Sequence, residues 1–295
     1  MASLSETNYT SARQELEEFG YTVVPNVLTE DECKHAYHMF HEWKNTIPDH
    51  DYIHYNVDPH GIYKYHQAGH TKHAWYIRTR PKVQSVFKDI WRTEQLIVSF
   101  DGCCYIPKNL NKKDKNWTHS DQAPTSEGLQ CIQGFVALTE NEERTFVVYE
   151  GTHKIHHQFF KDRNIQNSKN WNRISDEDIE KLKDKKRVLH VPAGSLVLWD
   201  SRSFHQNQYG KPYSEERVVQ YVCFLPKNHE KNTPKMQEKR LKYFQERRTT
   251  SHWPAPIRVN GLQPKSYGNN RNVIDYSLLP EQNIDEYQEK INELL

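Results

Sequence analysis

The sequence of 295 residues predicts a mainly β fold with helices, an α+β domain whose core is a barrel or sandwich of short strands. From about residue 95 onward, strand-like apolar runs follow one another, separated by turn-like or polar segments. Helical patterns fall mainly in the N-terminal third and after residue 226. Aromatic residues make up 12% of the chain. Disordered chains are poor in such residues, so a folded protein is expected although 27% of the residues are charged.

The N-terminal third is predicted to contain helices, one strand and a long loop. "SARQELEEFG" is typical of a short helix that ends at Gly20, and "YTVVPNVL" of a strand. Thr29 and Glu32 form a capping box, which predicts that the following "CKHAYHMFHEW" is a helix. Residues 44–75 show no clear period and are interpreted as a long ordered loop. "PKVQSVFKDIW" has the apolar spacing of an amphipathic helix.

The predicted strands lie in residues 95–226. They are "LIVSFDGCCYI", "LQCIQGFVAL", "TFVVYE", "KRVLHVPAGSLVLWD" and "RVVQYVCFL". A polar insert, residues 154–187, interrupts them and has a helical pattern around "SDEDIEKLKD". Residues 227–295 are expected to form a basic helix and a mostly irregular tail. We therefore expect one decorated domain over residues 1–295.

Composition limits the classes of partner. The net charge of +1 gives no overall field that would favour nucleic acid or a membrane. Five cysteines without C-x-x-C spacing argue for a reducing compartment and against a zinc ribbon. No signal-like core and no long apolar run are present, so a cytoplasmic protein without a membrane partner is expected. The basic stretch 227–248 could bind single-stranded nucleic acid, but packing of this helix on the barrel is favoured. The oligomeric state is left open.

The stretch "WTHSDQAP" carries the first candidate metal ligands. His119 and Asp121 are two residues apart, so in a strand their side chains point to the same face. Non-haem iron(II) oxygenases bind the metal with two histidines and one carboxylate. His205, near the start of a later strand in "SFHQN", is the best third ligand. His153 in "EGTH" is a weaker candidate, because that segment is typical of a turn at the site's rim.

Arg217 is the candidate anion-binding residue. It opens the strand "RVVQYVCFL" and shares a face with Val219, Tyr221 and Cys223. If this face is inward, the guanidinium is buried and needs a partner, yet no acidic residue is fixed on that face. An anionic ligand would meet this need, because arginine can bind a carboxylate with two parallel hydrogen bonds.

The ordered set His119, Asp121, His205 and Arg217 resembles the iron(II)- and 2-oxoglutarate-dependent oxygenases, within them the phytanoyl-CoA dioxygenase-like family. "FGYTVVPNVLTEDEC", "FVVYEGTHK" and "PAGSLVLWDSRSFH" resemble further family segments, so the resemblance covers roughly residues 18–226. It implies a double-stranded β-helix, the jelly-roll or cupin-like fold. It also implies that Fe(II) is bound by the triad, that Arg217 holds the far carboxylate of 2-oxoglutarate, and that O2 is consumed. Succinate and CO2 would be released as an unknown small organic substrate is hydroxylated.

Four further residues are predicted to contact the co-substrate. They are Gln133, Asn207, Tyr105 and Lys108. Gln133 and Asn207 are chosen because strand periodicity can turn them inward, and the other two because they lie just before the triad. Trp117 could form a wall of the pocket. His66 or His70 could bind substrate, and the loop 44–75 and the insert 154–187 are expected to form a lid.

Two other functions remain open at this point. The chain could be a catalytically silent β-helix protein that binds a ligand in the same pocket. It could also be a different cupin-like metalloenzyme, such as a hydrolase or isomerase with zinc or manganese. Arg217 favours the oxygenase over the second alternative, because an oxoacid co-substrate explains a cation at that position.

Overall fold

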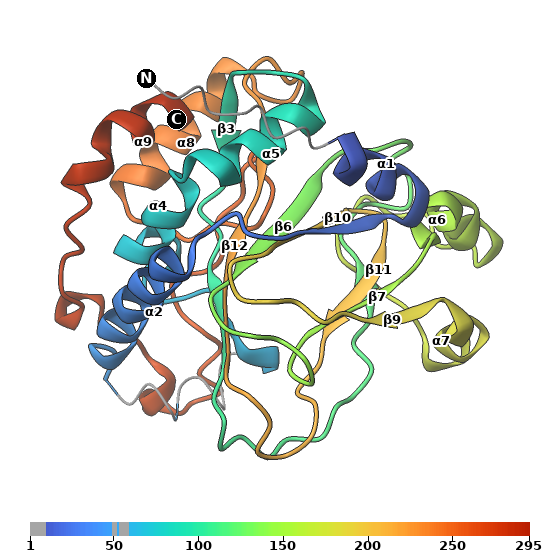
Figure 1. Cartoon of the computed structure of the whole chain (residues 1–295), viewed down its shortest axis with the longest axis horizontal. Helices are drawn as coiled ribbons and strands as arrows, with labels where there is room; N and C mark the ends of the chain where they lie inside the picture. Colours follow the sequence, from blue (N-terminus) through green and yellow to red (C-terminus); the bar gives the residue numbers. More distant parts are fainter. Residues whose placement is uncertain (1–9, 49–51, 53–58) are drawn as a thin grey trace.

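The computed structural model describes residues 10–48, 52 and 59–295 of the chain (Figure 1). In this part, two antiparallel sheets form a jelly-roll. The larger sheet has the order β1-β10-β6-β12-β4-β2 and the smaller sheet the order β8-β5-β11-β7-β9. The larger sheet is built from β1 (Tyr21–Val24), β10 (Leu196–Asp200), β6 (Ile132–Ala137), β12 (Arg217–Val222), β4 (Cys103–Ile106) and β2 (Ile62–Tyr63). The smaller sheet is built from β8 (Asn172–Arg173), β5 (His119–Ser120), β11 (Phe204–Asn207), β7 (Phe146–Tyr149) and β9 (Lys186–Val188).

Strands that are distant in the sequence alternate between the two sheets, which is the arrangement of a double-stranded β-helix. The chain passes from β4 in the larger sheet to β5 in the smaller, then back to β6, and out again to β7 and β9. It then returns through β10, β11 and β12. The mixed α+β fold and the jelly-roll predicted for this chain are therefore confirmed.

Helices cover the outer face of the larger sheet. Figure 1 shows α2 (Glu30–Asn45), α4 (Lys72–Arg78), α5 (Pro81–Trp91), α8 (Pro234–Gln245) and α9 (Gln288–Leu294) gathered on one side of the molecule. On the other side lie α6 (Thr152–Asp162) and α7 (Asp176–Lys181), beyond the smaller sheet. A short pair of strands, β3 (Leu96–Val98) and β13 (Phe224–Pro226), extends the fold beneath α5. No helix in the described part of the chain combines the length and apolar character that a membrane crossing needs.

The two helix boundaries predicted near the N-terminus are confirmed. The first helix, α1 (Thr10–Phe19), ends where Gly20 takes a φ of +84°. A Cβ at this position would lie 2.4 Å from His153 Nδ1, so close packing as well as the backbone angle requires glycine. Thr29 caps α2 by accepting from the Glu32 amide, and Glu32 accepts from the Thr29 amide in return.

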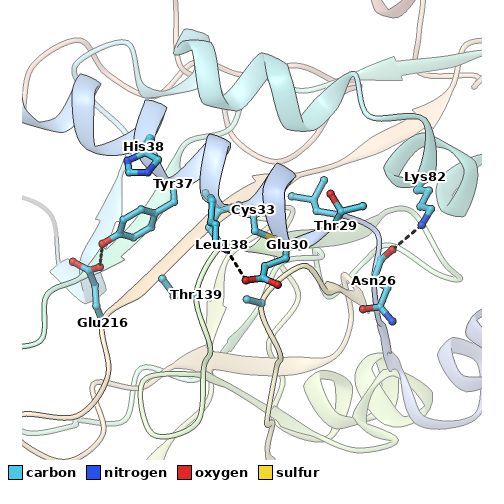
Figure 2. Close-up of a pocket in the computed structure, with 13 residues that line it drawn as sticks. Asn26, Thr29, Glu30, Cys33, Tyr37, His38, Lys82, Leu138, Thr139 and Glu216 are labelled. Atoms are coloured by element: carbon cyan, nitrogen blue, oxygen red, sulfur yellow. Dashed lines mark hydrogen bonds and ion pairs between the residues drawn. The ribbon is translucent and has the colours of Figure 1, made fainter.

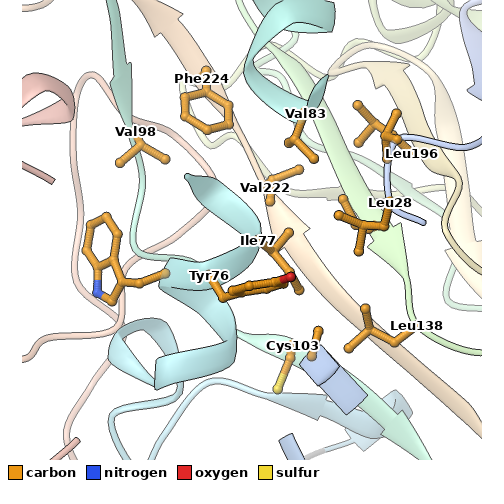
Figure 3. Packing of buried hydrophobic residues seen from close by; sticks show 14 of the residues in the cluster. Leu28, Tyr76, Ile77, Val83, Val98, Cys103, Leu138, Leu196, Val222 and Phe224 are labelled. Carbon is orange, nitrogen blue, oxygen red and sulfur yellow. The ribbon is translucent and has the colours of Figure 1, made fainter. Parts of the chain in front are cut away.

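The helix α2 is held to the sheet by a partly buried polar contact as well as by apolar packing. Tyr37 donates a hydrogen bond of 2.6 Å to Glu216, the residue directly before β12 (Figure 2). Apolar side chains of α4 and α5 pack against the outer face of the larger sheet (Figure 3), and buried residues of α2 belong to the same cluster. This face includes Val222 from β12 and Leu196 from β10, and Phe224 from β13 belongs to the same cluster. Burial of so many large side chains fixes the helices in place, because each contributes roughly 1.5–3 kcal/mol.

A second apolar cluster fills the space between the two sheets. Phe135 and Trp199 enter from the larger sheet, while Phe146 and Val148 enter from the smaller. Phe146 and Trp199 lie in contact, with ring centroids 4.6 Å apart. The barrel is therefore packed at one end, and the polar residues described below occupy the rest of its interior.

Two predicted irregular regions are more ordered than the sequence indicated. Within the predicted loop 44–75, residues 49–51 and 53–58 lie outside the described part, but β2 and the start of α4 belong to it. The tail 249–295 ends in α9, although its pattern suggested mostly irregular structure. The short elements in both regions contain few apolar residues, but these residues are buried against the core. Tertiary contacts therefore decide the structure of both regions.

Candidate metal centre

Two strands of the smaller sheet bring three candidate ligands together. His119 on β5 is the register partner of His205 on β11. Asp121 Oδ2 lies 3.5 Å from His119 Nε2 and 3.3 Å from His205 Nε2. All three side chains are buried, and their ligand atoms lie within 4.8 Å of one another. This is the donor set and the spacing that a facial two-histidine, one-carboxylate site requires.

Backbone carbonyls orient both imidazoles. His119 Nδ1 lies 3.0 Å from the carbonyl oxygen of Trp117, and His205 Nδ1 lies 2.9 Å from that of Ser203. A carbonyl can only accept, so each Nδ1 carries the proton and each Nε2 has a free lone pair. Both lone pairs are on the side of Asp121, which is the state needed to bind a cation.

The electrostatics of the triad favour a charged carboxylate at Asp121 and the neutral form of His205. Burial raises the pKa of the Asp121 carboxyl, but His252, His119 and His205 together outweigh this and hold that pKa well below its ordinary value. Burial, followed by the nearby His119, lowers the pKa of His205. Deprotonated ligands are the forms that coordinate a metal.

Gln133 contacts the triad directly. It projects from β6 and donates from Nε2 to Asp121 Oδ2 at 3.2 Å. Its Oε1 is buried and has no hydrogen-bond partner among the described residues. The sequence predicted that Gln133 faces inward, and the structure places it beside a ligand of the candidate metal site.

A cavity of about 200 Å³ adjoins the triad. Asn207 and Tyr221 line it, and Asn207 Nδ2 donates to the Tyr221 hydroxyl at 2.9 Å. Asn207 Nδ2 also lies 3.8 Å from Cys104 Sγ, while Arg217 Nη1 lies 3.1 Å from the same sulfur. Arg217 is therefore inside the barrel, next to the inner end of the cavity.

Arg217 is fully buried, with an exposed fraction of 0%, and makes no ion pair with a carboxylate in the described part of the chain. Its Nε donates to Asn141 Oδ1 at 3.0 Å, and its guanidinium lies 5.1 Å from the centre of the Phe135 ring. Its Nη2 has no hydrogen-bond partner among the described residues. A buried cation with one free donor is costly unless an anion reaches it.

Two predicted co-substrate contacts are corrected by the structure. Tyr105 faces outward from β4, where its ring lies 5.5 Å from that of Phe40 on α2. Cys104 and Ile106 take the inward positions of this strand instead. Lys108 follows the end of β4 on an exposed loop and does not line the cavity. A strand alternates its faces, so an error of one residue in the register turns a predicted inward side chain outward.

The other histidine candidates lie away from the triad. His153 Nε2 contacts the carbonyl oxygen of Glu17 on α1 at 3.1 Å. His70 Nε2 contacts the carbonyl oxygen of Arg248 at 3.0 Å, and His66 lines a separate small cavity. None of these three lines the cavity at the triad.

Sequence reasoning missed several cavity residues, among them His252, Asp101 and Trp171. His252 comes from the C-terminal tail, and its Nε2 lies 3.8 Å from Asp121 Oδ2. Asp101 also lines the cavity, and burial raises the pKa of this carboxyl to about 6. The irregular segment around "HWPAP" carries no period that would orient His252, so only its proximity in space reveals it.

A second acidic and histidine cluster and a larger cavity lie elsewhere. Glu140, Glu142 and His190 form an exposed group with ligand atoms within 4.8 Å. Exposed acidic groups of this kind are common without a bound ion. The larger cavity, about 850 Å³, lies under α2 and includes Tyr37 and Glu216 (Figure 2). Neither feature includes a residue of the buried triad.

The fold and the triad define the class: double-stranded β-helix proteins that carry two histidines and a carboxylate inside the barrel. The chain belongs to the phytanoyl-CoA dioxygenase family, whose sequence profile matches residues 16–208. It is 29% identical over 177 residues to Ava biosynthesis cluster protein O of Aspergillus versicolor. That match covers 55% of this chain and 57% of the Aspergillus protein, so it spans little more than half of that relative's length.

Two solved structures are similar in fold. GlcNAc Inducible Gene 2 protein from Candida albicans matches with a TM-score of 0.56 and 14% identity, over 75% of this chain and 64% of that chain. HygX from Streptomyces hygroscopicus, solved with nickel and 2-oxoglutarate bound, matches with a TM-score of 0.50 and 11% identity. That match covers 74% of this chain and 87% of HygX. At these identities the likeness establishes the shared fold alone.

Proposed function

We propose that the protein is a non-haem iron(II)- and 2-oxoglutarate-dependent dioxygenase that hydroxylates a small organic substrate and releases succinate and CO2. The observation that carries this proposal is the buried convergence of His119, Asp121 and His205 inside a double-stranded β-helix. Membership in the phytanoyl-CoA dioxygenase family supports an oxygenase-type enzyme. HygX, a neighbour in fold, binds nickel and 2-oxoglutarate, and was also solved with hygromycin B bound.

The residues present suit the metal. His119 and His205 would supply two nitrogen ligands through Nε2, and Asp121 would supply one oxygen. This mixed set is typical of non-haem iron(II) oxygenases, which keep the remaining coordination positions open. Gln133 would hold Asp121 in place through its hydrogen bond to Oδ2.

The residues present also suit the co-substrate. Arg217 would hold the far carboxylate of 2-oxoglutarate, because its Nη2 is a buried donor without a partner. Asn207 and Tyr221 line the cavity between the triad and Cys104, which Arg217 contacts. Their amide and hydroxyl groups would orient the bound co-substrate. When bound, iron(II), 2-oxoglutarate and O2 together supply the oxidising chemistry, while the chain supplies position and a dry site.

The test is conversion of 2-oxoglutarate to succinate by the full chain loaded with iron(II) under oxygen. Some turnover is expected even without the true substrate, and none is expected for His205→Ala. His190→Ala is the matched control, because it removes a histidine from the exposed cluster and should leave turnover unchanged. Folded protein that binds iron(II) and 2-oxoglutarate but releases no succinate with a broad substrate panel would contradict the proposal.

The two rival functions predict different outcomes. A catalytically silent binding protein would show no succinate and no oxygen consumption under the same conditions. A hydrolase or isomerase that uses zinc or manganese would bind its metal equally well with or without 2-oxoglutarate. Substitution of Arg217 would also leave the activity of such an enzyme unchanged.

A further inference from the structure

Five aromatic rings follow one another, and the last three of them, Trp117, His119 and Trp171, line the metal cavity. Tyr209 and His60 have ring centroids 6.5 Å apart, at an interplanar angle of 24°. His60 stacks on Trp117 at 3.8 Å and 13°, and Trp117 stacks on His119 at 4.9 Å and 25°. Trp171 also stacks on His119, with ring centroids 5.4 Å apart at 29°. The imidazole of a candidate metal ligand thus contacts two indole rings.

The stack is closed at one end and open at the other. At the closed end, the ammonium of Lys112 lies 5.9 Å from the centre of the Tyr209 ring, and the Tyr209 hydroxyl accepts from the His60 amide at 2.9 Å. At the open end, Trp171 lines the cavity but is 52% exposed. A half-exposed indole at the mouth of a site leaves apolar surface in water, which is typical of a ligand contact.

The charge of the cavity wall also restricts what can enter. Among the described residues that line it, none is lysine or arginine, whereas Asp101 and Asp121 are both present. In the loaded site, iron(II) and Arg217 would balance the charges of Asp121 and a 2-oxoglutarate dianion. Asp101 then remains as a further acidic group in the wall, with Arg78 and His252 near it. His252 adds a buried Nε2 that lines the same cavity and has no hydrogen-bond partner in the described part of the chain.

We infer that the substrate is a planar aromatic or heteroaromatic molecule, neutral or cationic, that stacks on the half-exposed indole of Trp171. This inference rests on the proposed function, since it names the substrate class of that reaction. Stacking supplies the affinity for a planar ring, because offset aromatic pairs are favourable beyond their buried area. Asp101, a carboxyl that lines the cavity, selects against an acidic substituent and for an N–H or O–H group. A bulky aliphatic substrate would not stack on Trp171. An acidic substrate would bring a second carboxylate beside Asp101.

The test measures binding of small probes to the full chain loaded with nickel(II) and 2-oxoglutarate, which prevents turnover. Tryptamine is a planar cation, indole-3-acetamide is planar and neutral, and indole-3-acetate is a planar anion. 2-Cyclohexylethylamine is a cation of similar size without an aromatic ring. The first two probes are expected to bind about tenfold more tightly than the last two, as measured by calorimetry.

Substitution of Trp171 assigns the effect to the stack. Trp171→Leu keeps an apolar side chain without a planar ring and should weaken tryptamine binding about threefold to tenfold. Trp171→Phe should restore most of it. Tyr267→Leu is the control, because that exposed aromatic residue does not line the cavity. Equal binding by Trp171→Leu and the parent chain would overturn the inference.

The remaining outcomes separate this inference from the proposed function. Tighter binding of indole-3-acetate or of the cyclohexyl probe, or no binding of either favoured probe at millimolar concentration, would overturn the substrate class. In those cases, normal affinity for nickel(II) and 2-oxoglutarate would leave the proposed function intact. If instead 2-oxoglutarate fails to bind while tryptamine binds through Trp171, the oxygenase proposal fails and the aromatic site stands.

Discussion

Gln133 donates a hydrogen bond of 3.2 Å from its Nε2 to Asp121 Oδ2, and this contact joins the larger sheet to the carboxylate of the triad. Gln133 belongs to β6 of the larger sheet, whereas Asp121 directly follows β5 of the smaller sheet. A donor fixed on a strand of the other sheet restricts the rotation of the carboxylate. It therefore prepares Asp121 to point toward His119 and His205 before a cation arrives.

Gln133→Leu is expected to weaken metal binding by about tenfold to one hundredfold, because the carboxylate of Asp121 loses its orienting donor. Calorimetric titration of manganese(II) or nickel(II) into the metal-free chain measures this. Gln220→Leu is the matched control, since Gln220 is a buried amide that donates only to backbone carbonyls. The control should lower stability but keep the metal affinity of the folded chain. Equal losses of affinity in both variants would remove Gln133 from this role.

Arg217→Gln is expected to weaken 2-oxoglutarate binding by about tenfold to one hundredfold, because a charge-assisted contact is lost. Metal affinity measured without 2-oxoglutarate should be unchanged. Arg217→Lys should be intermediate, since lysine keeps the charge but cannot bind a carboxylate with two parallel bonds.

Arg144→Gln provides the control for Arg217. Arg144 is also a buried arginine, but it donates to the carbonyl oxygens of Pro107, Lys108 and Leu110. Its substitution should lower the free energy of unfolding and leave the 2-oxoglutarate affinity of the folded chain as it is. If the 2-oxoglutarate affinity of Arg217→Gln is unchanged, the free Nη2 of Arg217 serves a different ligand.

The C-terminal tail is expected to loosen in Arg240→Met. Arg240 on α8 is buried and donates to Asn232 Oδ1, to the carbonyl oxygen of Pro254 and to that of Leu295. Loss of these contacts should raise hydrogen exchange in residues 249–260 before it changes the β-helix, and should move His252 away from the cavity. Lys242→Met, on the exposed face of the same helix, should leave exchange unchanged. If hydrogen exchange in residues 249–260 is the same in both variants, the tail is held by other contacts.

Folding stability should fall as the pH drops below about 6.5, where an unperturbed histidine begins to bind a proton. Burial lowers the pKa of His70 and of His73 to about 3 in the folded chain. The unfolded chain therefore binds more protons between about pH 6.5 and pH 3, and the stability that is fully present above this range is lost through it.

Each of the two histidines should contribute a slope of roughly 1.4 kcal/mol per pH unit. Urea unfolding at about pH 8, 7, 6 and 5 measures the free energy, and His70→Gln should reduce the slope. His157→Gln, at a half-exposed histidine, should not. A free energy that is flat from about pH 7 to pH 5 would contradict the assignment.

Much of the site could be predicted because its signals are local. The spacing of His119 and Asp121 sets both side chains on one face of a strand, and the apolar runs before His205 and within "RVVQYVCFL" set the later strands. The capping box and Gly20 fix two helix ends by contacts within a few residues. Such features depend on backbone geometry that neighbouring residues determine.

Other parts of the site depend on which segments meet in space. Tyr105 was predicted to contact the co-substrate because it lies just before the triad, but it faces outward. The sequence of β4 could not show this, because it is apolar at every position and its period gives no phase. His252, Asp101 and Trp171 reach the cavity from a tail, a loop and the insert, where no regular period orients a side chain. The sequence by itself determined the β core, the order of the triad and the buried arginine. The tertiary structure decided the aromatic stack, the contact of His252 with Asp121, and which side chains of β4 point inward. These features follow from packing between distant segments.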